Sequence, residues 1–116
     1  MGNPVSWGLQ PSVLTDPGDA GAISVTEGLA ICALVSAGAE TRTLADPQRS
    51  GQMLSLSFKT DGGDCVLTSA SPVNQAGNNT LTFADAGEHI LLIGSDDGAD
   101  IEWRVVCSDG VALSTV

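Results

Sequence analysis

The sequence predicts an all-β protein, a small antiparallel β-barrel or sandwich with an extended N-terminal arm. Apolar residues recur with a period of two along several segments, as expected for strands with one buried face. Gly, Asp, Asn and Pro cluster between those segments, where they favour tight turns. No segment carries the apolar repeat of a long amphipathic helix. A chain of 116 residues with 42% hydrophobic side chains is enough for one modest core.

Residues 1–21 form the predicted arm. Pro4, Pro11 and Pro17, together with four glycines, are expected to prevent a helix or a sheet ladder from running through this segment. Apolar side chains are costly to leave in water, so we expect the arm to order on a partner; the alternative is a disordered terminus. The residues that would attach the arm to its partner are Val5, Trp7, Leu9, Val13 and Leu14.

The remaining residues, 22–116, form a β-rich body. Trp103 is expected to anchor its core, because Ile101, Val105 and Cys107 lie on the same face of an alternating segment. Four segments alternate in this way and are predicted to be half-buried strands: 23–26, 54–59, 80–83 and 101–107. The residues expected to pack in the core or between chains are Leu54, Leu56, Phe58, Phe83, Ile101, Trp103 and Val105.

Two further runs, 29–35 and 90–93, are apolar at every position. This composition favours strands that are covered on both faces, although a short helix is the alternative for the first run. Only four aromatic residues are present, so the core of a single chain is thin. We therefore expect a second chain to cover one face of these strands.

Turn residues separate all of these segments and predict that the strands follow one another through hairpins. Residues 89–115 in particular are expected to form a three-stranded antiparallel meander, because loops of three to five residues are too short for a parallel crossover. The predicted turns lie at 46–47, 61–64, 77–79, 86–87, 96–98 and 108–110.

The charge of the chain limits its partners. Four basic and fourteen acidic residues give a net charge of -10, which repels nucleic acid and anionic lipid surfaces. No apolar stretch is long enough to span a membrane, and the first ten residues lack the features of a signal peptide. We expect the chain to be made and kept, at least at first, in a cytosol.

Residues suited to catalysis or to metal binding are scarce, and we expect neither an enzyme nor a cofactor. His89 is the only histidine and has no Gly-x-Ser-x-Gly elbow to pair with, so it is expected to be structural or to lie on the surface. The acidic cluster at 96–100 does not fit a twelve-residue calcium loop. Cys32, Cys65 and Cys107 are far apart and are predicted to be buried free thiols, not a metal site or a disulfide framework.

Several short turn segments and alternating strand segments follow one another in the last two thirds of the chain, and their order along the sequence is informative. They are LADP at 44–47, Gly51, LSL at 54–56, TDGGD at 60–64, NQAGNNTLTF at 74–83, AGE at 86–88 and WRVV at 103–106. Over residues 40–115 this order resembles the trimeric β-domains of tailed-bacteriophage virions, namely small head-decoration (cement) proteins and head and tail fibres.

The resemblance implies a homotrimer whose chains share a core, with the major capsid protein as a second partner. It implies a place on the exterior of the virion after synthesis in the host cytoplasm, and a function in reinforcing the shell. The alternative is a head- or tail-fibre or spike module for attachment or for binding host-surface carbohydrate. The short chain, without a long shaft, favours the decoration role.

Overall fold

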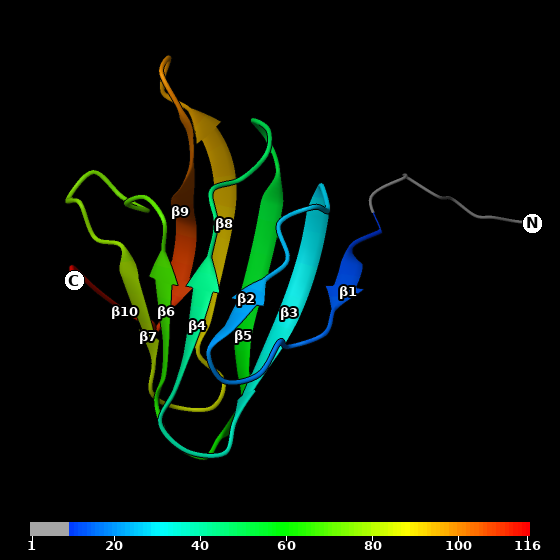
Figure 1. Ribbon diagram of the computed structural model, residues 1–116, viewed down its shortest axis with the longest axis vertical. Helices are drawn as coiled ribbons and strands as arrows, with labels where there is room; N and C mark the ends of the chain where they lie inside the picture. The colour runs from blue at the N-terminus through cyan, green and yellow to red at the C-terminus, as the bar shows by residue number, and fades with distance from the viewer. Residues whose placement is uncertain (1–9) are drawn as a thin grey trace, which may run out of the picture.

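A computed structural model describes residues 10–116 as two five-stranded sheets packed face to face (Figure 1). Sheet A has the order β1 (Ser12–Leu14), β3 (Leu29–Ser36), β5 (Met53–Asp61), β8 (His89–Asp96), β9 (Ile101–Asp109). Sheet B has the order β10 (Ala112–Ser114), β7 (Thr80–Phe83), β6 (Cys65–Ser69), β4 (Glu40–Leu44), β2 (Gly21–Ile23). The all-β class and the sandwich are confirmed. In the part of the chain that is described, no helix has the length and apolar character to cross a membrane.

The sheets are mixed, which differs from the predicted antiparallel arrangement. The first six strands alternate between the sheets, so that β1, β3 and β5 run parallel in sheet A while β2, β4 and β6 run parallel in sheet B. Parallel neighbours need a long crossover, and here each crossover contains a strand of the opposite sheet. The later strands add antiparallel pairs at β5–β8, β8–β9, β6–β7 and β7–β10.

The predicted meander over residues 89–115 is wrong at its last strand. β8 and β9 form the expected antiparallel hairpin, but β10 pairs with β7 in sheet B instead of continuing sheet A. Val111, between β9 and β10, is buried in the core. Because this side chain is buried between the sheets, the chain crosses from sheet A to sheet B after β9. The short connection therefore does not form a second hairpin.

Part of the predicted arm belongs to the sandwich. β1 pairs with β3 and β2 begins at Gly21, so the expectation that no sheet ladder runs through residues 1–21 is wrong from Ser12 onward. Both strands are at sheet edges, where a neighbouring proline does not interrupt a central ladder. Val5, Trp7 and Leu9 lie outside the described residues.

The core lies between the sheets and contains five of the predicted core residues: Leu54, Leu56, Phe58, Phe83 and Trp103. Trp103 is 1% exposed, and its indole N–H donates to the backbone oxygen of Ala45 at 2.9 Å. Phe58 and Phe83 come from opposite sheets, with ring centroids 6.0 Å apart. Val105 packs partly buried against this cluster, and Ile101 is half-buried at the start of β9.

One charged side chain, Arg42 of β4, is completely buried between the sheets. Its guanidinium donates to both carboxylate oxygens of Asp16, at 2.8 and 2.9 Å. It also donates to a Glu40 oxygen at 2.9 Å and to the backbone oxygens of Val35 and Thr41. This network links sheet B to β3 of sheet A and to the connection between β1 and β2, and it pairs a charge that would otherwise be costly to bury.

Replacing Trp103 by Ala should lower the free energy of unfolding by about 3 to 5 kcal/mol, because the change leaves a large cavity and removes the bond to Ala45. Urea denaturation followed by circular dichroism measures this loss. Val106→Ala, on the same strand at a residue that is 52% exposed, is the matched control and should change stability little. An unchanged midpoint for Trp103→Ala would mean that the indole is not in the core.

Asp16→Asn should destabilise the fold by about 2 to 3 kcal/mol near neutral pH, because it weakens the partner of a buried guanidinium. Burial alone would raise the pKa of Asp16, but hydrogen bonds from Arg42, Val35 and Gly18 outweigh burial and lower this pKa below 3.8. A lowered folded-state pKa gives stability that is complete above the unfolded pKa and lost as the pH falls through the folded value.

The wild type should therefore lose stability below about pH 4. Asp16→Asn should lose less over the same range. Thermal melts from pH 6 to pH 2 measure the difference, and Asp85→Asn, at an exposed turn position, is the control that should keep the wild-type profile. Parallel pH profiles for wild type and Asp16→Asn would contradict this assignment.

Candidate assembly surface

The outer face of sheet A is the most distinctive surface of the described residues. Strands β3, β5 and β8 lie side by side in sheet A (Figure 1). Burial alternates along each of them, so every second residue points away from the core. We call this surface the outer A face. Its residues are Leu29, Ile31, Ala33 and Val35 of β3, Met53, Ser55 and Ser57 of β5, and His89, Leu91 and Ile93 of β8.

These residues form rows across the three strands. The first row is Leu29, Met53 and Ile93; the second is Ile31, Ser55 and Leu91; the third is Ala33, Ser57 and His89. In the second row a small side chain lies between two larger apolar ones. The central strand β5 is therefore a furrow at this level, with β3 and β8 as its apolar ridges.

The runs 29–35 and 90–93 are strands, as predicted, but within one chain only one face of each is covered. Ala30, Cys32 and Leu34 are buried, while Ile31 is 38% and Val35 43% exposed. Leu91 and Ile93 are half-buried. The sandwich covers the inner face of these strands and leaves an apolar outer face in contact with solvent.

Charge is distributed very unevenly around this surface. None of the residues of the outer A face is charged, although the chain carries a net charge of -10. The nearest charges on sheet A are Lys59, the exposed residue that follows Ser57 and the buried Phe58 on β5, and an ion pair at 3.0 Å between Glu102 and Arg104 on β9, where Arg104 pairs with Ile93. The other exposed carboxylates belong mainly to the connections, among them Asp64, Asp85 and Asp97. An apolar face without an unpaired carboxylate on so acidic a chain is typical of a surface that another molecule covers.

A serine and the only histidine meet on the outer A face. Ser55 Oγ lies 2.7 Å from Nε2 of His89, and both side chains are half-buried. The sequence places these residues 34 positions apart and did not reveal the pair. A nucleophile beside a base is one part of a hydrolytic site, but a third group that orients the base and donors for an oxyanion are further parts. Within residues 10–116 no carboxylate bonds to this imidazole, and the pair lies on an open sheet.

Cys107 is exposed, so the prediction that all three cysteines are buried is wrong for this residue. The register of β9 against β8 shifts between Leu91 and Leu92, where Val106 is an extra residue. A bulge of this kind reverses the alternation beyond it. Cys107 therefore does not share the face of Trp103, and it pairs with Leu91 beside the outer A face. Cys32 and Cys65 are buried.

The predicted attachment residues that can be placed lie on β1, next to β3. Val13 is 78% exposed, whereas Leu14 packs against the core. The register continues the second row of the outer A face to both edges of the sheet, since Val13 pairs with Ile31 and Cys107 pairs with Leu91. Val13 thus extends the apolar outer face, whereas Leu14 contributes to the core of the sandwich.

The acidic cluster at 96–100 forms a turn. Asp96 accepts a bond from the Gly98 N–H, and Asp97 accepts bonds from the Ala99 and Asp100 N–H groups. These bonds, with that from Asp100 first, lower the pKa of Asp97. Backbone capping accounts for these carboxylates, and no group of residues suited to hold a metal ion occurs between residues 10 and 116.

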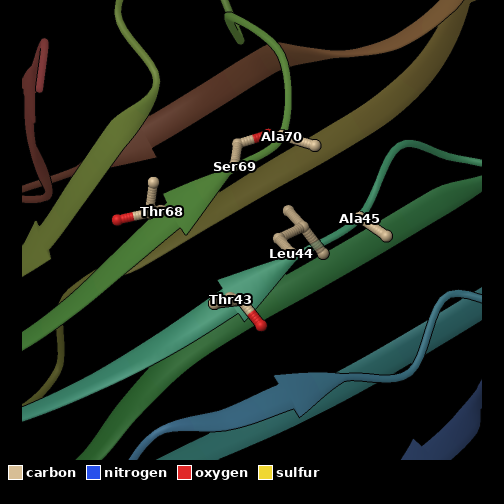
Figure 2. A pocket seen from close by; sticks show the side chains of 6 residues that line it. All are labelled: Thr43, Leu44, Ala45, Thr68, Ser69 and Ala70. Atoms are coloured by element: carbon tan, nitrogen blue, oxygen red, sulfur yellow. The ribbon is translucent and has the colours of Figure 1, made fainter.

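A cavity of about 350 Å³ opens where β4 and β6 end (Figure 2). Its walls are small or aliphatic, and none of the lining residues is charged: Thr43, Leu44, Ala45, Thr68, Ser69 and Ala70. Two buried polar atoms in this region, Asp46 Oδ1 and Ser69 Oγ, have no hydrogen-bond partner among the described residues. The lining supplies hydroxyl groups but no acid–base pair.

Comparison with known proteins gives no family. No protein-family model matches the chain, and no curated protein matches it. The interpretation of the chain therefore depends on its residues and on the geometry described above.

Native protein should have one reactive thiol, on Cys107, because it alone among the cysteines is exposed. Burial raises the pKa of Cys32 to about 11 and also raises that of Cys65, which disfavours their reactive thiolate forms. Mass spectrometry after brief maleimide treatment should show a single adduct on the native chain and three after denaturation. Cys107→Ser should show none in the native state; an adduct on Cys32 or Cys65 would contradict the assignment.

Proposed function

We propose that this chain is a structural virion protein that binds the outer surface of a tailed-phage capsid as a homotrimer and reinforces the shell. The observation that supports an assembly role is the outer A face, which is mainly apolar and has no carboxylate on a chain of net charge -10. Contiguous apolar surface on a soluble domain marks an interaction site, because burying it against another protein is favourable. The capsid as partner comes from the resemblance to phage decoration modules.

The charge of the sandwich supports an exterior position on the particle. Exposed carboxylates repel packaged nucleic acid and keep a particle surface soluble. In a decoration protein they would face solvent, while apolar surfaces would face the other copies and the capsid. Two kinds of contact are needed, one that builds the trimer and one that attaches it, and we assign attachment to the N-terminal residues that include Trp7.

Sedimentation velocity at micromolar concentration should show a species of three times the 11.7 kDa chain mass. Burial of the apolar face provides the driving force, and added salt should strengthen the association by screening repulsion between acidic chains. Thermal denaturation of the same samples controls for misfolding. A stable monomer over this concentration range would contradict the trimer.

Deleting residues 1–9 should leave the sandwich and its assembly intact, because β1 and Asp16 are retained. Binding to capsids assembled without this protein should fall at least tenfold, since three attachment segments on one trimer multiply a weak contact. Co-sedimentation with capsids and image reconstruction of the decorated particles measure this. Trp7→Ala is the matched point variant and should weaken binding in the same direction. Unchanged binding by both variants would place attachment on the β-sandwich.

A further inference from the structure

We propose that the outer A face is the contact between copies of this chain, arranged around a threefold axis so that β3 of one copy packs against β8 of the next. The inference rests on the trimer of the proposed function and names the surface that builds it. The central strand β5 then faces the axis, and the apolar ridges on β3 and β8 of neighbouring copies pack against each other around it.

The occupant follows from the charge of the surface. The residues of the outer A face include no carboxylate, and the charges beside it are Lys59 on β5 and the paired Glu102 and Arg104 on β9. A second copy of this chain offers the same apolar surface without an unpaired carboxylate. Glu102 and Arg104 at the edge of the sheet already neutralise each other. Two acidic chains can therefore approach through this face without bringing unpaired carboxylates into the contact.

The size of the face can be estimated from its strands. Strands of eight or nine residues are roughly 26 Å long, and three of them span roughly 14 Å, which gives a projected area of about 370 Å². This area is about half of the roughly 800 Å² that each partner contributes to a standard interface, so the contact calls for several copies that each touch two neighbours.

The polar pair at the centre of the face favours three copies over two. The Ser55 hydroxyl and the His89 Nε2 atom bond to each other. The other ring nitrogen of His89 and the remaining lone pairs of the hydroxyl still need water or polar partners. Two faces stacked directly on each other would bury this pair under apolar side chains. Around a threefold axis the furrow of β5 faces two other furrows, and a water-filled centre is compatible with the polar groups.

The rows fix which residues meet. If the axis runs along the strands, residues of one row lie at the same height in every copy. Ile31 on β3 of one copy then meets Leu91 on β8 of its neighbour, and Leu29 meets Ile93 in the row beside it. Within one chain the members of each pair lie on either side of β5, roughly 10 Å apart, which is too far for a disulfide bond.

Engineered cysteines test this arrangement. In a Cys107→Ser background, the double variant Ile31→Cys with Leu91→Cys should, after mild oxidation, migrate mainly as a covalent trimer on a non-reducing gel. Each single variant should remain uncross-linked. Val35→Cys with Ile93→Cys is the mismatched control, because these residues lie at opposite ends of the ridges and should not cross-link. Leu29→Cys with Ile93→Cys is a second matched pair, should the first fail to fold.

The outcomes separate this inference from the proposed function. Covalent dimers from a single variant would indicate a twofold contact and overturn the threefold arrangement. Reduced samples that sediment as trimers but give no cross-link from either matched pair would overturn the choice of surface and leave the trimer standing. Wild-type protein that sediments as a monomer would overturn both.

Discussion

The buried guanidinium of Arg42 is the interaction on which the arrangement of the two sheets depends most. It comes from sheet B, yet it donates to the Val35 backbone oxygen in sheet A and to Asp16 between β1 and β2. Asp16 in turn accepts the Val35 N–H at 2.9 Å. An unpaired charge would be very costly in this place, so the network specifies a single relative position for these segments. The three-residue edge strand β1 begins just before this anchor and is held against β3 by it.

The two surfaces of sheet A differ in composition and in burial. The inner surface is closed by sheet B and holds the aromatic core around Trp103. The outer surface keeps apolar ridges on β3 and β8, with Ser55 and Ser57 of β5 between them. Acidic residues are displaced to the connections, where their carboxylates often cap backbone N–H groups, as Asp97 does. Charged and apolar surface thus lie on different parts of one small domain.

The bulge in β9 shows how one extra residue changes the chemistry available at a surface. If Val106 kept the regular alternation of the strand, Cys107 would share the face of Trp103 and point toward the core. With the bulge, the thiol lies beside Leu91 at the edge of the outer A face, while Cys32 and Cys65 remain buried with raised pKa values. After β9, Val111 is buried in the core and the chain continues into sheet B as β10.

Local pattern in the sequence determined the strands, because the side-chain period of two and the turn residues act over a few positions. It identified the strands around Leu54, Phe83 and Trp103 and the two apolar runs that become ridges of the outer A face. It could not show that successive strands alternate between two sheets, that Arg42 finds Asp16 across 26 residues, or that Ser55 meets His89. It also did not reveal the bulge at Val106, beyond which the alternation of side chains along β9 is reversed. Pairing partners, register and bulges are decided by long-range packing and by satisfying buried polar groups, so only the tertiary structure determined which side of each strand is core and which is exposed.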